Sequence, residues 1–228
     1  MERDTDARLA RRSGPSGSTP APSLAPEHEW SAAARLLHPA LRPAGTTGVD
    51  GRRLDLPAGS GLPGKPLIVA GPAGLALGYV MPGEGFGVLV GAEHLLAWGV
   101  GPDQVHAAAM ANLAVWSSET PWIREMSGRR TVIWSDAGRG MDAARILLPE
   151  VRAQLAGEFI GESGGFGRIL VGLPERDLLI VTGLTEGDDE FAALFAGYVA
   201  ERWHGADDPI APRLFELAGG ELIALDPT

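Results

Sequence analysis

The chain contains no cysteine, and Lys65 is the only lysine among its 228 residues. Without thiols it cannot form disulfide bonds, use a cysteine nucleophile, or hold zinc or an iron–sulfur cluster with cysteine ligands. A chain without cysteine is compatible with a reducing compartment. The segment Met1–Arg12 also lacks the apolar run of a secretory signal. We therefore predict a cytoplasmic protein.

Positive charge is scarce as well. The 19 lysines and arginines are outnumbered by 29 acidic residues, and the formal net charge is -10. Nucleic acids and anionic membranes are bound through basic surfaces, so we predict that neither is a partner. Arg124, Arg129 and Arg130 form a local basic group in the sequence. A solvated loop is the preferred interpretation of that group over a binding patch.

A long uninterrupted apolar run is also missing. Pro66–Gly83 carries no charge and approaches the roughly 20 residues of a membrane-spanning helix. However, Gly71-Pro72-Ala73-Gly74 is a strong turn signal in its middle. Two short buried strands, one on each side of this turn, explain the run better than a membrane span does.

The composition divides the chain into a tail and a globular part. Ser13–Pro26 is rich in serine, proline, glycine and alanine, and it has too few large apolar side chains to offset the entropy of ordering. We therefore predict a disordered tail over residues 1–26 and a single domain over 27–228. Within that domain, residues 27–65 are expected to form a helix and a Gly/Pro-rich segment, and residues 66–228 the main core.

The pattern of apolar residues predicts an α+β fold. Helices are expected at 27–41, 102–118, 142–156 with a kink or restart at Pro149, and 188–204 with Asp188 as the N-cap. Strands are expected at 67–70, 75–81, 85–90, 131–135, 168–173, 178–182, 214–218 and 221–225. Regular βαβ alternation is absent, which favours an antiparallel or mixed β-sheet with helices packed mainly on one face.

Three glycine-rich strings resemble catalytic or nucleotide-binding motifs. Gly59–Lys65 has the spacing of a phosphate-binding loop, but Pro66 follows it in place of a serine or threonine and a helix. Gly161–Gly165 resembles a serine-protease string, but no histidine lies in a protease-like context. Gly83–Gly87 resembles a dinucleotide fingerprint, but a strand follows it. We interpret all three as loops.

Metal and cofactor signals are weak. His94 and His106 lie near Glu93 and Glu119, but they lack the i, i+4 spacing that places two ligands on one helical face. We predict no metal site and no cofactor.

Two polar positions merit separate attention. Asn112 lies on the apolar face of its helix, where a buried amide needs a hydrogen-bond partner, and a structural bond is preferred over a ligand contact. Arg176 lies at the tip of the hairpin that contains Pro174-Glu175-Arg176-Asp177. It could bind an anion, although pairing with neighbouring acids is the simpler interpretation.

Several short blocks resemble one protein family. The blocks run from Ala107 to Leu113, from Gly140 to Leu147 and from Leu170 to Ile180, and an apolar hairpin follows Asp208-Pro209. Together, over about residues 79–225, they resemble the YtpQ-like bacterial family of unknown function. The resemblance implies a cytosolic α+β domain and no established activity. It places Asn112, Asp142, Arg145 and Asp177 in the motif blocks, and with Arg176 these are the candidate binding residues.

These observations favour a non-enzymatic binding or regulatory module whose partner is a protein or a small molecule. The alternative is a hydrolase that uses a carboxylate with His94 or His106 in a pocket assembled by the fold. The two hypotheses differ in geometry. An enzyme would bring Asn112, Asp142, Arg145 and Asp177 into one cleft with a histidine, whereas structural roles would leave them apart or bonded to the backbone.

Overall fold

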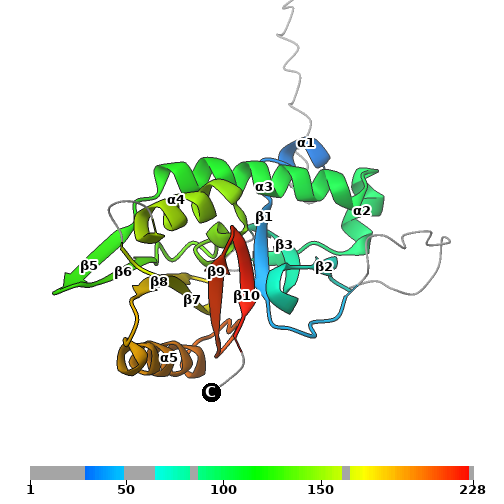
Figure 1. Ribbon diagram of the computed structural model, residues 1–228. Helices are drawn as coiled ribbons and strands as arrows, with labels where there is room; N and C mark the ends of the chain where they lie inside the picture. Colours follow the sequence, from blue (N-terminus) through cyan, green and yellow to red (C-terminus); the bar gives the residue numbers. More distant parts are fainter. Residues whose placement is uncertain (1–28, 49–64, 83–86, 161–164, 226–228) are drawn as a thin grey trace, which may run out of the picture.

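A computed structural model describes residues 29–48, 65–82, 87–160 and 165–225. Two antiparallel β-sheets lie side by side under a long helix (Figure 1), which confirms the α+β class. The helices are α1 (Trp30–Ala33), α2 (Ala92–Trp98), α3 (Pro102–Glu119), α4 (Pro149–Ile160) and α5 (Asp189–His204), with short 3-10 helices η3 (Pro72–Gly74) and η4 (Ala143–Leu147).

The smaller sheet contains β1 (His38–Arg42), β2 (Ile68–Ala70), β3 (Ala76–Pro82) and β4 (Gly87–Leu89). Strand β1 corrects the prediction of a helix through residue 41, because the helix ends at Ala33 and the chain then pairs with β3. The reason is Pro39, which has no N–H to donate to a helix and which a strand paired on one side tolerates.

The larger sheet has the strand order β10-β9-β7-β8-β6-β5, and every pairing in it is antiparallel. Its strands are β5 (Ile123–Ser127), β6 (Arg130–Ser135), β7 (Arg168–Glu175), β8 (Leu178–Leu184), β9 (Leu214–Ala218) and β10 (Glu221–Ala224). At one end, β10 packs beside η3 of the smaller sheet. At the other end, β5 is the outermost strand.

Alternate residues of β7 and β8 contribute to two separate apolar clusters. Ile169 and Val171 pack with α3 and α4, whereas Leu170 and Leu178 pack with α5. Figure 1 accordingly shows α3 and α4 above the large sheet and α5 below it. The expected placement of helices mainly on one face therefore holds for α3 and α4, and α5 covers the opposite face.

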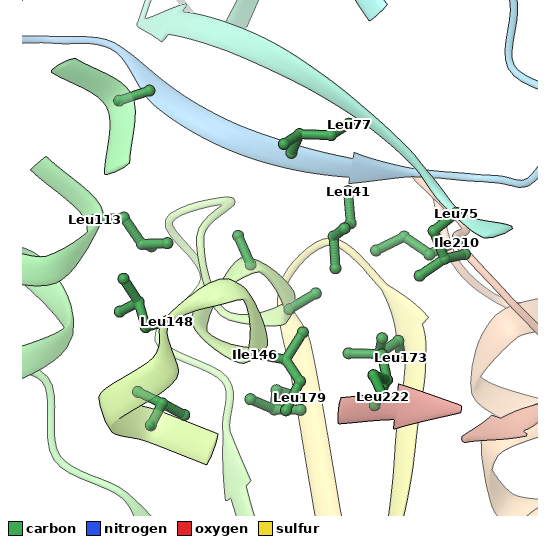
Figure 2. Close-up of a cluster of buried hydrophobic side chains, with 14 of the residues drawn as sticks. Leu41, Leu75, Leu77, Leu113, Ile146, Leu148, Leu173, Leu179, Ile210 and Leu222 are labelled. Carbon is green, nitrogen blue, oxygen red and sulfur yellow. The ribbon is translucent and has the colours of Figure 1, made fainter. Parts of the chain in front are cut away.

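One apolar cluster joins the two sheets. Figure 2 shows leucine and isoleucine side chains from both sheets and from the helical segments beside them meeting in a single buried region. Leu41 and Leu77 come from the smaller sheet, Leu113 from α3, and Leu173 and Leu179 from the larger sheet, each less than 5 % exposed. Burial of this apolar surface is the main force that holds the sheets together.

Other local predictions had mixed outcomes. The chain does restart at Pro149, with η4 before it and α4 after it. The β7–β8 loop has two residues, Arg176 and Asp177, where the expected strands left the four residues 174–177 between them, because β7 continues past a register shift to Glu175. Helix α2 and strand β5 were not predicted from the sequence.

The tail over residues 1–26 lies outside the described residues. So does most of each glycine-rich string: residues 59–64 of the first, 161–164 of the second and 83–86 of the third. Their interpretation as loops stays a prediction.

Candidate functional site

Arg145, one of the candidate residues, is almost completely buried at 1 % exposure. Its guanidinium donates hydrogen bonds to the hydroxyl oxygens of Ser117 and Ser135, at 3.0 and 2.8 Å, and to the backbone carbonyls of Ser117 and Thr120, both at 3.1 Å. It also lies over the ring of Trp122, with 3.7 Å between Cζ and the ring centroid. This side chain therefore joins the end of α3 to β6 and η4.

Asp142 completes the same network and has no exposed surface. Its Oδ1 accepts hydrogen bonds from the Ser135 hydroxyl at 2.5 Å and from the Ala137 backbone N–H at 2.9 Å. Ser135 thus connects the carboxylate to Arg145. Burial lowers the pKa of Arg145 from 12.5 to about 10, and the nearby Asp142 charge opposes that shift. Both groups are enclosed by protein, so neither is placed to contact a ligand.

Asn112 also has a structural role. Its side-chain amide donates to the carbonyls of Ala34, at 2.8 Å, and Leu37, at 2.7 Å. These carbonyls lie just after α1, where a helix end leaves acceptors without partners. The structural bond expected for Asn112 is therefore present, and the residue fixes α1 on α3.

The β7–β8 turn brings the other two candidates together. Asp177 accepts a hydrogen bond from the Gly140 N–H, and Arg176 lies 3.4 Å from the carboxylate of Asp208. Arg42 of β1 binds the same Asp208 carboxylate at 2.6 and 2.9 Å. The acid paired with Arg176 is therefore 32 residues away in sequence, not a neighbour in the turn. This cluster links the two sheets through Asp208.

Gly140 explains why the turn fits closely. A side-chain carbon at this position would come within 2.8 Å of Arg176 Nε, and the backbone φ is +72°, which favours glycine. The Arg176 Nε is buried against this glycine and has no hydrogen-bond partner in the described part of the chain. The atom faces protein and not an open cleft, so the geometry does not favour anion binding by Arg176, which was the alternative to ion pairing.

His38 lies at the edge of this cluster and is 8 % exposed. Burial lowers its pKa below the ordinary value of 6.5; its bond to the Leu36 carbonyl raises the pKa, Arg176 lowers it and Asp177 raises it. The folded protein therefore favours the neutral ring. As the pH falls through 6.5, the unfolded chain binds the proton first, and the folded state loses relative stability.

We expect the melting temperature to fall between pH 7.5 and pH 5, and part of that fall to disappear in His38→Gln. Differential scanning fluorimetry of both proteins across this range measures the difference. The difference between the two curves isolates the contribution of His38. Parallel curves for the two proteins would contradict the role assigned to His38.

The two histidines of the hydrolase hypothesis lie apart from the four motif residues. The Gly91 N–H donates to His94 Nδ1 at 3.0 Å, which caps the start of α2. His106 Nδ1 lies 2.9 Å from the Tyr79 hydroxyl, whose pKa is raised to about 12, chiefly by burial and further by the Asp103 charge. Neither histidine has a contact with Asn112, Asp142, Arg145 or Asp177 among the described interactions.

A different feature is open to partners, namely the β5–β6 hairpin. All five residues of β5 are exposed, including the apolar side chains of Ile123 at 43 % and Met126 at 68 %. The hairpin projects from the left side of the molecule in Figure 1, with β5 on its outer side. Proteins usually blunt such an edge, because a free row of backbone donors and acceptors can pair with another strand.

The hairpin register shows which backbone groups face outward. Gly128 and Arg129 form a two-residue loop, with Gly128 at a φ of 64° and Ser127 opposite Arg130. A loop of this length closes on a hydrogen-bonded pair, and hydrogen-bonded pairs then alternate along the strands. The N–H and C=O groups of Arg124 and Met126 therefore point away from β6, toward solvent.

The side chains of β5 alternate between two faces. Arg124 and Met126 lie opposite Ile133 and Thr131, on the face that carries α4, and Arg124 pairs with Glu158 of that helix. Ile123 and Glu125 lie on the α5 face. Sequence reasoning missed this strand because residues 123–127 alternate apolar and charged residues only partly. The available signal in the sequence was Gly128, a turn residue that lies between the two segments that pair as β5 and β6.

Arg124, Arg129 and Arg130 were interpreted as a solvated loop, but they belong to the β5–β6 hairpin: Arg124 lies in β5, Arg130 in β6 and Arg129 in the turn between them. Arg124 pairs with Glu158, and Arg130 lies 4.6 Å from the ring centroid of Phe191. No cluster of three or more potential metal ligands occurs in the described residues. No helix in the same part of the chain is both long and apolar enough to cross a membrane.

Comparisons with known proteins add no relative: no family model, no curated protein and no solved structure matches this chain. The resemblance to the YtpQ-like family therefore stays a prediction.

Proposed function

We propose that the protein is a non-enzymatic, cytoplasmic binding module that takes up an extended segment of another protein along β5. The observation that carries the proposal is that all five residues of this edge strand are exposed at the end of a six-stranded sheet. An extended chain added to such an edge gains backbone hydrogen bonds, and alternate side chains then provide specificity.

The polar candidates from the sequence support a non-catalytic role. Asn112 and Arg145 are hydrogen-bonded inside the protein, and Asp142 is bonded there through Oδ1, while its buried Oδ2 has no partner among the described residues. Arg176 and Asp177 connect two loops and a strand. No observation in the described residues favours the alternative of a hydrolase. The net charge of -10 favours a protein ligand over a nucleic acid.

Proline at position 126 provides a direct test. The Met126 N–H points away from β6, so Met126→Pro should keep the hairpin while removing one donor from its outer edge. The preceding Glu125 is already extended, as a residue before proline prefers. We expect peptides selected from a random display library on the wild-type protein to bind Met126→Pro about tenfold more weakly or worse.

Met126→Ala is the matched control, because it removes the same side chain and keeps the N–H. It should retain most of the binding. Amide hydrogen exchange gives an independent readout, in which a bound peptide slows exchange at Arg124 and Met126. Peptides that bind Met126→Pro as tightly as wild type, or a library that yields no binder, would contradict the proposal.

A further inference from the structure

We infer that the segment bound along β5 runs antiparallel to it and presents a basic side chain to Glu125. This inference rests on the proposed function and specifies the chemistry of the ligand. It starts from the side chains that β5 displays beside its outward-facing backbone groups.

Glu125 is the carboxylate available on this edge. It is exposed, and no described residue forms a hydrogen bond or an ion pair with it. Arg124, the opposite charge on the strand, already pairs with Glu158 of α4. The edge therefore offers one negative charge without a partner, within a protein of net charge -10 that attracts cationic ligands over a longer range.

The alternation of hydrogen-bonded pairs places Glu125 where a side chain interacts most directly with an added strand. The outward groups of Arg124 and Met126 would bond an added antiparallel strand, which makes Glu125 the intervening pair without hydrogen bonds. In pairs of this kind the Cα atoms are closer, at about 4.5 Å, and the side chains interact most directly. A lysine or arginine opposite Glu125 is thus favoured, and an acidic residue there is disfavoured.

The neighbouring positions complete the pattern. Met126 and Ile123 are exposed apolar side chains, so apolar ligand residues are favoured opposite both. Arg124 retains donors beyond the one that binds Glu158, which favours an acidic residue opposite it. Read from its own N-terminus, an antiparallel ligand then has the order apolar, basic, acidic, apolar.

A second copy of the chain fits this edge poorly. In the symmetric antiparallel register that pairs all five residues of β5, Glu125 lies directly opposite the Glu125 of the other copy. Like charges in that position destabilise strand pairing. Self-pairing of β5 in this register is therefore disfavoured, whereas a basic segment of a different protein meets Glu125 with the opposite charge.

A charge-exchange experiment tests the inference. Two synthetic peptides share the order threonine, valine, X, glutamate, valine, threonine, where X is lysine in one and glutamate in the other. Binding of each to the full chain and to Glu125→Lys is measured by fluorescence anisotropy. We expect the wild type to prefer the lysine peptide by on the order of tenfold, and Glu125→Lys to reverse the preference.

The control is Glu221→Lys, which makes the same change of net charge at an exposed position of β10. It should leave the preference as in wild type, since it lies at the far edge of the sheet. If Glu125→Lys and Glu221→Lys reversed the peptide preference equally, the preference would come from the net charge of the protein and not from Glu125, and the inference would be overturned. A dimer in sedimentation equilibrium that Met126→Pro dissociates would overturn it too, because the edge would then be occupied by a second copy.

The outcomes also separate this inference from the proposed function. If both designed peptides fail to bind while library peptides still bind in a manner sensitive to Met126→Pro, the assigned ligand chemistry is wrong and docking along β5 stands. If binding of every peptide is indifferent to Met126→Pro, the docking site itself is wrong.

Discussion

Arg145→Met is expected to lower the free energy of unfolding by about 3–5 kcal/mol, the range for leaving a buried charge uncompensated, because Ser135 links the buried Asp142 carboxylate to the Arg145 guanidinium. The Asp142 carboxylate is fully buried, and the substitution removes the cation near it. It also removes the donors to the carbonyls of Ser117 and Thr120 at the end of α3. Equilibrium unfolding in urea, followed by tryptophan fluorescence, measures the change.

Two further variants make the result specific. Arg139→Met changes an exposed arginine and should alter stability by no more than about 0.5 kcal/mol. Asp142→Asn combined with Arg145→Met should recover part of the loss, because the isolated buried charge is gone. A loss below about 1 kcal/mol in Arg145→Met, or strict additivity in the double variant, would show that the two groups are not coupled through Ser135.

The same network shows where sequence reasoning succeeded and failed. Asp142 and Arg145 were singled out through family-like blocks as candidate binding residues, yet the structure encloses both. Their partners Ser117, Ser135 and Thr120 come from two other elements. Burial of a charged pair depends on these long-range contacts, which no local pattern contains. A charged residue within an apolar helical segment was the one available hint.

The fold was easier to predict from the sequence than the roles of the candidate site residues. The hairpin at Gly219-Gly220 and the helix from Pro102 follow from local sequence signals. Two consecutive glycines accept the positive φ that both adopt in the hairpin turn, and proline is favoured in a first helical turn. Asp188 precedes α5 as expected, but its carboxylate accepts from Thr185 and not from the helix amides. Local signals located this element correctly, and the actual hydrogen bonds depended on the preceding turn.

The proposed binding edge was missed for a related reason. Exposure of β5 is a property of strand order, because β5 ends the larger sheet and no strand of the described chain pairs with its outer side. The sequence of residues 123–127 is compatible with a loop, an inner strand or an outer strand. Only the assembled sheet shows that Glu125 is exposed beside outward-facing backbone groups, and that Arg124 is already paired.

The second large effect is expected where α5 rests on the sheet. A side-chain carbon at Gly172 of β7 would lie 2.5 Å from a methyl carbon of Val199 and 2.9 Å from one of Ile180. Both neighbours are buried and belong to the α5 cluster. Gly172→Ala therefore forces α5 away from the sheet or distorts side chains, and overpacking of this kind lowers stability by about 1–3 kcal/mol.

Val199→Ala should relieve the strain, since it removes the methyl groups that the new carbon would meet. We expect each single variant to be destabilised and the double variant to be more stable than their sum predicts by about 0.5–3 kcal/mol. Gly197→Ala is the control on the same helix. It has no atom within 4 Å of the added carbon and should stabilise by about 0.5–1 kcal/mol.

Urea unfolding of the wild type, the two single variants and the double variant measures the coupling, and Gly197→Ala is unfolded beside them as the control. A positive coupling, with stabilisation by Gly197→Ala, would establish that α5 is held against the sheet at Gly172, on the face opposite α3 and α4. Purely additive effects would mean that α5 is free to shift, and its close contact with β7 would then be wrong. Strand β5 belongs to the same sheet as β7. As long as that sheet stays folded in Gly172→Ala, the variant should still bind peptides along β5.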